Sequence, residues 1–477
     1  MVASSLFSQL AQTGLLPEMS ILSGIFIICF LTYLLPVYSK GISLWIALIS
    51  LGIAFYLSGS VQEIKPLQSM GIDPWTGILK RYFCIATAAS LFGWLEWKQA
   101  RIGDISAIFI ALLLVACLSL MMLVQAADLW LMIISAEAFS FSAYGIASSN
   151  QSGDNSHESV LRYFGIGALA TSVSVFGLTW VIGFRESMPD GILGFQNSEA
   201  FFPVAGAVFF LAFLFFKLGS FPFHAWVPGI FRTAPTPVAG FLAASPKVAA
   251  GFACLHLVQI LDVNLSLPFV VLALFTGIFG NIAAFRASGL REMLAYSAIG
   301  QASFLVIPAI FSRQVSGAAG HLLYYSISYA VAIQAAFFAS QYFENQYRDR
   351  LSISDSAGFF RFHPLAVLVL TAILFSIIGI PPFAGFTGKL LVMSGLPAGL
   401  NLLPSGMVAL LFLVGIVNTV LAAGYFLKIP YSMIFKPSLL ESHPLRSSSA
   451  TLFLLLMGLV FLIAAFLFPA FFFSQDF

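Results

Sequence analysis

The chain carries very little charge. Only 8% of its 477 residues are Lys, Arg, Asp or Glu, whereas a typical soluble domain has about 25%. So few charged side chains cannot cover a surface that faces water, and this excludes a soluble globular protein. The net charge of +2 gives no support for a nucleic-acid-binding surface.

Cysteines and cofactor motifs are scarce as well. The four cysteines show no CxxC spacing and lie in apolar runs, which favours a packing role over a metal site or a disulfide set. The sequence contains no GxGxxG, P-loop, HExxH or haem-attachment motif. We therefore expect no nucleotide, haem or metal site in this chain. The cysteines are Cys29, Cys84, Cys117 and Cys254.

Long apolar runs are what the sequence does have. Hydrophobic residues make up 60% of the chain, and the runs reach the length of about 20 residues at which a helix spans a bilayer. They recur along the whole chain, so one signal peptide does not explain them, and the alternation typical of a membrane β-barrel is absent. The links are too short to hold a soluble domain. We predict an all-α polytopic membrane protein, a single membrane domain over 1–477, with about fourteen transmembrane helices at 19–38, 41–60, 76–95, 104–124, 127–148, 161–184, 201–222, 237–260, 266–286, 292–311, 319–342, 364–394, 407–433 and 451–474.

The basic residues are distributed unevenly between the two sets of loops. Of the 21 lysines and arginines, thirteen follow odd-numbered spans and five follow even-numbered ones. Loops rich in lysine and arginine remain on the cytoplasmic side of a membrane. The pattern therefore predicts that both termini lie on the non-cytoplasmic side.

Four ionisable residues fall well inside the predicted spans: Glu137, Lys217, Lys247 and Lys389. A charge at the centre of a bilayer costs roughly 3 kcal/mol on insertion scales, so such residues usually serve a function. Glycine or proline accompanies each lysine: Gly219 and Pro222, Pro246, and Pro381 with Pro382. Proline breaks the helical hydrogen-bond ladder, and the freed carbonyls persist at membrane depth only beside protein or water. We expect each lysine to lie near a hydrated break.

Lysine suits proton transfer in such a place. Burial and a nearby carboxylate move the pKa of a lysine in opposite directions, so movement of Glu137 relative to Lys217 would switch the lysine between holding and releasing a proton. Arginine stays charged and could not do this. The alternative is a set of static charges that only fixes helix packing.

A short internal similarity hints at a repeat. LGSFPF at 218–223 is similar to IGIPPF at 378–383, in the seventh and twelfth predicted spans. An odd number of helices between repeats inverts one relative to the other, as in many transporters. Chance, or shared helix-breaking chemistry, explains six residues equally well.

Four longer stretches carry a family resemblance: ISAEAFSFSAY (134–144), FKLGSFPFHAWVPGIFRTAPTPVAGFLAASPKVAA (216–250), LREMLAYSAIGQASF (290–304) and GIPPFAGFTGKLLV (379–392). They resemble the antiporter-like proton-channel subunits of respiratory complex I. LLPE at 15–18 and MGIDPW at 70–75 resemble that family too. The motifs occur in family order from residue 15 to about 440, and the second is highly specific.

The resemblance implies a fold and a role for each buried charge. The family fold has two inverted five-helix repeats, helices 4–8 and 9–13, here 104–260 and 266–433, with broken helices 7 and 12. Glu137 corresponds to the fifth-helix glutamate that pairs with the seventh-helix lysine, here Lys217. Lys247 corresponds to the eighth-helix lysine of the central axis, and Lys389 to the twelfth-helix lysine thought to connect to the outlet or to a neighbouring subunit.

One residue departs from the family pattern. The family commonly has SSIAHAGY where this chain has SAIGQASF, so Gln301 replaces a histidine. Glutamine can hydrogen-bond water but cannot titrate, which puts any proton step of that histidine in doubt. Six further side chains are candidate pathway groups, each also explained by ordinary packing or by a role in shaping a helix end: His224, His256, His321, Tyr144, Ser245 and Tyr325. Asp128 is expected to cap the fifth span.

These observations predict a proton-translocating subunit that couples quinone reduction in complex I to proton pumping, with no redox centre of its own. NADH, FMN, iron–sulfur clusters and quinone are expected in partner subunits. The expected partners are a second antiporter-like subunit, small membrane subunits and lipids, in a bacterial inner membrane. Two alternatives stay open: a subunit of a multisubunit Na+/H+ antiporter, and a structural scaffold within the membrane arm.

Overall fold

The computed structural model describes residues 14–34, 39–59, 73–100, 106–149, 154–187, 201–261, 264–315, 317–347, 352–401, 403–437 and 449–472. Helices account for nearly all of these residues, and within them the only bridge between extended segments joins Gly289 to Ser352. The predicted all-α fold is confirmed. Parts of the predicted polar links, such as 188–200 and 438–448, and the start of MGIDPW lie outside the described residues.

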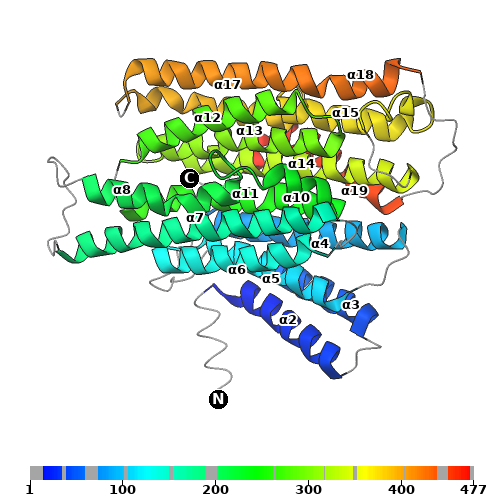
Figure 1. Ribbon diagram of the computed structural model, residues 1–477, viewed down its shortest axis with the longest axis horizontal. Helices are drawn as coiled ribbons and strands as arrows, with labels where there is room; N and C mark the ends of the chain where they lie inside the picture. Colours follow the sequence, from blue (N-terminus) through cyan, green and yellow to red (C-terminus); the bar gives the residue numbers. More distant parts are fainter. Residues whose placement is uncertain are drawn as a thin grey trace.

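The helices run side by side in a bundle (Figure 1). Those of the first part are α2 (Leu16–Leu34), α3 (Ser39–Leu57), α4 (Thr76–Ala100), α5 (Ala107–Val124), α6 (Leu129–Ala147), α7 (Asp154–Ser187), α8 (Phe201–Phe210), α9 (Ala212–Leu218), α10 (Val227–Thr233) and α11 (Thr236–Leu261). Those of the second part are α12 (Ser266–Ala284), α13 (Leu290–Phe311), α14 (Ala318–Tyr347), α15 (Pro364–Ile378), α16 (Ala384–Ser394), α17 (Ser405–Phe426), α18 (Lys428–Phe435) and α19 (Ser449–Leu467), with 3₁₀ turns η3 (Phe359–Arg361), η4 (Leu396–Asn401) and η5 (Pro469–Phe472).

Ten helical stretches in the described part of the chain are long and apolar enough to cross a membrane, and three shorter apolar ones accompany them at Gly41–Leu57, Pro203–Leu218 and Pro364–Ile378. The exact count of fourteen stays a prediction. Two boundaries differ from the sequence prediction, because polar residues extend the helices beyond their apolar parts: α7 begins at Asp154 and α14 continues to Tyr347.

The centre of the bundle is formed by α11, α13 and α14, which are almost completely enclosed. The blue helices α2 and α3 lie at one edge and the orange α17 and α18 at the opposite edge (Figure 1). Large apolar side chains such as Phe26, Trp45 and Val420 are exposed on these outer helices, as a surface in contact with lipid requires. Cys84, Cys117 and Cys254 are buried as predicted, whereas Cys29 is exposed on α2.

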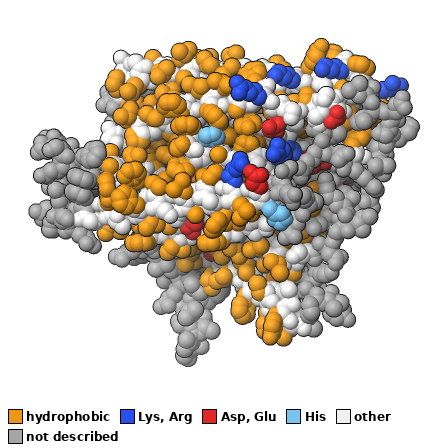
Figure 2. All heavy atoms as spheres, viewed as in Figure 1, with side chains coloured by type: hydrophobic (Ala, Val, Ile, Leu, Met, Phe, Trp, Pro, Cys, Tyr) orange, Lys and Arg blue, Asp and Glu red, His pale blue; other side chains and the backbone are white. Residues whose placement is uncertain are grey.

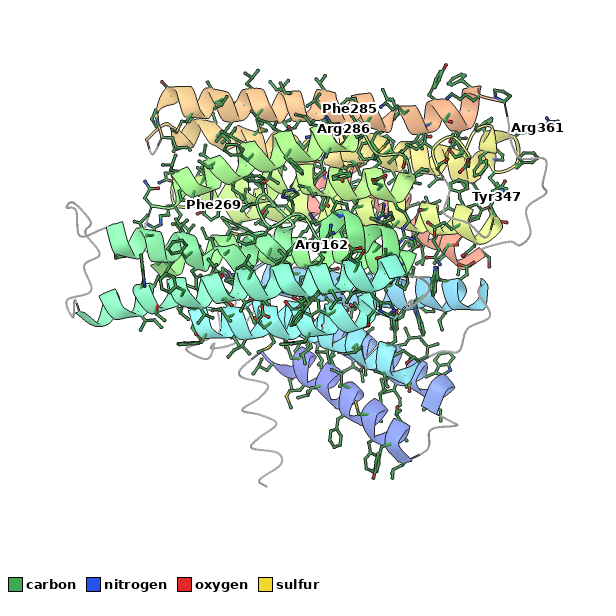
Figure 3. The ribbon with its side chains drawn as sticks, in the orientation of Figure 1. Arg162, Phe269, Phe285, Arg286, Tyr347 and Arg361 are labelled. Carbon is green, nitrogen blue, oxygen red and sulfur yellow. The ribbon has the colours of Figure 1, made fainter. Side chains whose placement is uncertain are left out.

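Basic side chains gather toward one end of the bundle. Figure 2 shows mostly apolar atoms on the left of the face in view and the lysine and arginine atoms further to the right. Figure 3 places Arg361 at the right, Arg286 near the middle, and Phe269, near the start of α12, to the left of Arg286. Both arginines follow odd-numbered predicted spans, and the assignment of loops to one side of the membrane stays a prediction.

Two of the predicted spans are broken in the same way. The α8–α9 span ends at Leu218, where Gly219 has a left-handed φ of 62° and Ser220 N donates to Phe215 O at 3.0 Å. The α15 helix ends at Ile378, where Gly379 has a φ of 92°. Glycine is the residue that adopts this conformation without a steric penalty. A cis X–Pro bond follows each glycine, at Phe221–Pro222 and Pro381–Pro382. The predicted breaks in these spans are confirmed.

Candidate functional site

Glu137 lies half-buried on α6, facing α7. Its Oε1 accepts a hydrogen bond from Thr171 Oγ1 at 2.6 Å. Asp128 precedes this helix, and its carboxylate accepts from Trp130 N at 2.7 Å and Leu131 N at 3.3 Å. Asp128 is therefore the helix cap that the sequence predicts.

Lys217 is buried in the last turn of α9. Its Nζ donates a short hydrogen bond to Ser140 Oγ on α6, and it lies 5.4 Å from the ring centre of Phe139 and 5.2 Å from that of Phe216. Aromatic faces attract a cation through their quadrupole. The ammonium is thus held by one hydroxyl and two rings.

Glu137 and Lys217 do not make the direct ion pair that the family resemblance implies. Both side chains belong to the described residues, and no ion pair joins them there. Ser140, less than one helical turn from Glu137, stands at Lys217, while Thr171 holds the carboxylate. The two charges are separate but close along the same face of α6, so a small side-chain movement would change their interaction.

Lys247 lies at the centre of α11 and is completely buried. Its Nζ donates to Leu218 O at 2.6 Å and to Ala298 O at 2.6 Å. Leu218 is the last residue of α9, so its carbonyl belongs to the negative end of that helix dipole. The broken helix therefore supplies the acceptor that stabilises a buried ammonium group.

Lys389 occupies an equivalent position at the second break. Its Nζ donates to Ile377 O at 3.1 Å and Ile378 O at 2.9 Å, the last carbonyls of α15. The Phe304 ring centre lies 5.0 Å away. Both helix breaks thus hold a lysine at a free C-terminal carbonyl, although one lysine comes from α11 and the other from α16.

Gln301 on α13 stands between these two lysines. Its Nε2 donates to Ile377 O at 3.4 Å, which is also an acceptor of Lys389. Ala298 O, the acceptor of Lys247, lies one turn earlier on the same helix. Tyr325 OH donates to Gln301 Oε1 at 3.0 Å. The polar groups of α13 therefore connect the two lysine sites. Tyr325, which contacts this connection, is one of the candidate pathway residues from the sequence.

Of the other candidates, Ser245 lies two residues before Lys247 on α11, and Tyr144 lies beside Ser140, the hydrogen-bond partner of Lys217. Ser245, on the same helix as Lys247, contacts Tyr82 OH at 3.3 Å. Tyr144 is half-buried and packs edge-on against Tyr163, with ring centres 4.7 Å apart. Its place is the α6–α7 contact, near Glu137.

The structure separates the three candidate histidines from the lysines. His224 lies in the first break, with its ring 4.1 Å from that of Phe279 and 5.7 Å from that of Phe221. His256 Nε2 lies 2.8 Å from Asp73 Oδ2. His321, half-buried near the start of α14, has a buried Nδ1 without a hydrogen-bond partner among the described residues. None of these rings hydrogen-bonds to Lys217, Lys247 or Lys389 within the described part.

Sequence reasoning missed a buried ion pair near the N-terminus. Lys80 Nζ lies 2.7 Å from Glu18 Oε1, with both side chains almost fully enclosed. Gln125 Nε2 donates to the same carboxylate oxygen at 3.2 Å. Lys80 lies in the first turns of α4, inside the predicted span 76–95, although the count of basic loop residues assigns it to the preceding loop. No pattern in the sequence links it to Glu18.

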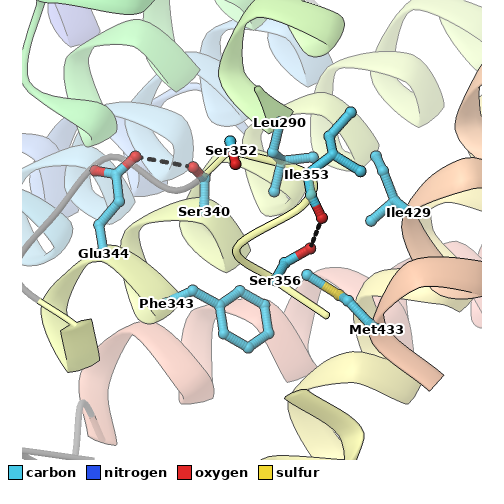
Figure 4. A pocket seen from close by; sticks show the side chains of 9 residues that line it. All are labelled: Leu290, Ser340, Phe343, Glu344, Ser352, Ile353, Ser356, Ile429 and Met433. Carbon is cyan, nitrogen blue, oxygen red and sulfur yellow. Dashed lines mark hydrogen bonds between the residues drawn. The ribbon is translucent and has the colours of Figure 1, made fainter. Parts of the chain in front are cut away.

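A second missed group is Glu344, near the end of α14. Its Oε2 accepts from Thr236 Oγ1 at 2.7 Å and its Oε1 from Ser340 Oγ at 3.0 Å, and Arg291 Nη1 lies 3.7 Å away. Beside it is a cavity of about 20 Å³, room for one water. Figure 4 shows Glu344 and Ser340 on one side of this cavity and Ile429 and Met433 on the other.

No group of three or more His, Cys, Asp or Glu side chains in the described ranges is arranged to hold a metal ion. What the geometry offers instead is a row of buried lysines with polar acceptors.

The sequences of known proteins match most of this chain. A family described as "NADH:quinone oxidoreductase/Mrp antiporter, TM" matches residues 126–422. The NADH-quinone oxidoreductase subunit N of Azorhizobium caulinodans is 31% identical over 353 residues, which cover 72% of this chain and 72% of that protein. The NAD(P)H-quinone oxidoreductase subunit 2 of Acaryochloris marina is 30% identical over 458 residues, covering 91% of this chain and 84% of that protein.

Solved structures have the same fold. A chain of respiratory complex I from Thermus thermophilus superposes with a TM-score of 0.77 at 23% identity, covering 95% of this chain and 97% of that one. A chain of the Mrp complex from Dietzia sp. DQ12-45-1b reaches 0.78 at 16% identity, covering 96% and 95%. The family match, the sequence relatives and the broken helices agree: this chain belongs to the NADH:quinone oxidoreductase/Mrp antiporter transmembrane family.

Proposed function

We propose that this chain is a proton-translocating membrane subunit of an NADH:quinone oxidoreductase. The observation that carries the proposal is the placement of two buried lysines at the free carbonyl ends of two broken helices, Lys247 at Leu218 O and Lys389 at Ile378 O. A lysine in this setting can exist with or without its proton, whereas an arginine could not.

The proposed route follows the polar groups in order. Glu137 moves between Thr171 and the neighbourhood of Lys217, which changes the electrostatic field at that lysine. The proton passes by way of Lys247 and the polar groups of α13 to Lys389. Glu344, beside a water-sized cavity, is a candidate for uptake from the side that carries the basic loops. Moving one charge against 100 mV requires about 2.3 kcal/mol, which a displaced buried charge can supply.

In this proposal the redox chemistry belongs to other subunits. NADH, FMN, iron–sulfur clusters and quinone bind there, and this chain responds to their turnover through contacts in the membrane. Its partners are a second antiporter-like subunit and small membrane subunits of the complex I membrane arm. The location is a bacterial inner membrane, with both termini on the non-cytoplasmic side, as the distribution of basic residues favours.

We also propose that 104–260 and 266–433 are inverted repeats. The support is the shared construction of the two breaks, in which a helix ends at a glycine of left-handed φ and its last carbonyl accepts from a buried lysine.

A subunit of a Na+/H+ antiporter is the second candidate, because the Mrp chain has the same fold. Relatives at 30% identity and above are quinone oxidoreductase subunits, which favours the first proposal. The third candidate is a structural scaffold in the membrane arm, in which only the neighbouring subunits pump protons.

One experiment separates these functions. The assembled complex carrying Lys217→Ala is placed in membrane vesicles, and proton pumping and quinone reduction are measured side by side. The matched control is Lys436→Ala, which removes an exposed lysine at the end of α18. We expect Lys217→Ala to lower both rates at least tenfold, while reduction of an artificial acceptor by the redox subunits continues and Lys436→Ala behaves as wild type.

If the Lys217→Ala complex pumps as many protons per quinone reduced as wild type, the scaffold is favoured. Pumping that requires added Na+ would favour the antiporter.

A further inference from the structure

A groove on the outer face of the bundle leads from the basic end toward the first helix break. It has a volume of about 480 Å³ and lies between α12, α13 and the segment after Gly219. Its apolar part is formed by Phe221, Phe275 and Phe279, all of them exposed. Arg286 and Tyr296 stand at its other end.

The length of this groove equals one leaflet of a membrane. From Phe275 to Arg286 the chain advances eleven residues, or about 16 Å at 1.5 Å per residue. Half of a hydrocarbon core of about 30 Å is about 15 Å. Figure 3 shows Phe285 and Arg286 together at the end of α12 away from Phe269. The groove therefore runs from the membrane surface to about mid-depth.

The charge at the surface end is positive. Arg286 is exposed and makes no ion pair within the described part of the chain. Glu292 also lines the groove and contributes one negative charge, and its Oε2 accepts from Ser288 N and Ser288 Oγ, each at 3.1 Å. A second cation, Lys428, lies 5.0 Å from the Phe285 ring centre. These two cations outnumber the one carboxylate, so this end of the groove has a net positive charge that attracts an anion.

We propose that this groove binds one anionic phospholipid. The phosphate pairs with Arg286, and one acyl chain lies along Phe279 and Phe275 and ends against Phe221. A free phosphate would leave the aromatic wall unused, and a partner helix would extend over both leaflets instead of stopping at mid-depth. The proposal rests on the membrane location of the chain and is independent of its role in proton transfer.

The lipid would cover the exposed segment that follows the helix break at Gly219. Phe221 follows the glycine at which α9 ends, and its backbone N donates to Thr276 Oγ1 on α12 at 3.2 Å. Phe221 and Pro222 are exposed on the outer face. An acyl chain lying on Phe221 separates the broken helix from the open bilayer and holds this segment against α12.

The test measures lipid retained by the intact purified complex. Complexes are exchanged into detergent with phosphatidylglycerol or phosphatidylcholine, and retained lipid is counted by native mass spectrometry. We expect Arg286→Gln to lower the preference for phosphatidylglycerol about fivefold, the equivalent of about 1 kcal/mol for one basic residue near a lipid surface. Arg286→Lys should restore it. Ala283→Phe, which fills the groove without changing charge, should remove the site for both lipids.

Arg361→Gln is the matched control, since Arg361 is exposed outside the groove. Its lipid preference should equal that of wild type. A photo-crosslinking residue at position 282, which lines the groove, should attach to phospholipid in the assembled complex. An unchanged preference in Arg286→Gln, unchanged retention in Ala283→Phe, or crosslinks from position 282 to another subunit would each overturn the proposal.

Discussion

Lys389 and Gln301 share one backbone acceptor. Ile377 O receives a hydrogen bond from Lys389 Nζ at 3.1 Å and from Gln301 Nε2 at 3.4 Å. Tyr325 OH in turn donates to Gln301 Oε1 at 3.0 Å. The glutamine that replaces the family histidine is therefore in contact with the lysine site, and it positions groups there although it cannot carry a proton itself.

Replacing Gln301 tests this positioning role. Gln301→Leu removes the side-chain partner of Tyr325, and we expect proton pumping to fall about fivefold, corresponding to one hydrogen bond of about 1 kcal/mol. Gln301→His supplies a group that can titrate, with an unperturbed pKa near 6.5. Pumping by that variant, measured from pH 5.5 to 8, should gain an inflection that wild type lacks. Equal pH profiles in the two proteins would show that position 301 lies off the path.

Charge and proton release can be separated at Lys247. Lys247→Arg keeps a cation for Leu218 O but does not release a proton, so the complex should assemble and lose pumping. Lys247→Met leaves the buried carbonyl of Leu218 without its partner, at a cost of about 1–3 kcal/mol. We expect a lower thermal midpoint in this variant, measured on the purified complex. Normal pumping by Lys247→Arg would contradict a proton-carrying role.

Thr171 holds Glu137 apart from Lys217 through the 2.6 Å hydrogen bond of its hydroxyl. Thr171→Val keeps the shape of the side chain and removes that bond. A hydrogen bond to a charged group contributes about 1.5–3 kcal/mol, so we expect about a tenfold lower pumping rate with normal assembly. Thr179→Val is the control, because Thr179 is exposed and its hydroxyl donates to Phe176 O of its own helix. Equal pumping in the two variants would exclude this role for Thr171.

The Glu18–Lys80 pair should contribute to stability only as a pair. Removing one partner of a buried ion pair costs about 3–5 kcal/mol, because a buried charge is left alone. Lys80→Met should therefore shorten the half-life of the complex at elevated temperature. The double variant Glu18→Gln with Lys80→Met should recover much of that loss. A double variant as unstable as the sum of the two singles would mean that the two side chains act independently.

Stability should also depend on pH through His363, in the segment before α15. Burial lowers the pKa of His363 below its ordinary value of 6.5, so in acid the unfolded chain binds a proton there more readily than the folded chain. The stabilising contribution of the neutral ring is complete above pH 6.5 and is lost as the pH falls toward the lowered pKa. Thermal midpoints of wild type and His363→Asn, compared from pH 7.5 to 5, should differ in slope, with the variant flatter. Parallel curves would count against this residue.

The sequence by itself determined the class of the fold and the type of chemistry. Few charges and long apolar runs indicate a membrane protein. Only helices and closed barrels satisfy their backbone hydrogen bonds in a bilayer, and the alternation typical of a barrel is absent. The glycines and prolines beside Lys217 and Lys389 predicted the two helix breaks, since these residues act on the local backbone. The same local logic identified Asp128 as a helix cap.

Only the tertiary structure decided which groups meet. Leu218 O and Lys247, Gln301 and Ile377 O, and Glu18 and Lys80 are each separated by many residues, and no periodicity connects them. The expected Glu137–Lys217 pair was replaced by contacts with Thr171 and Ser140. Helices at the centre of a membrane bundle are apolar on all sides, so the sequence shows that they are buried but not which neighbour each face contacts. That choice depends on packing among helices distant in the chain.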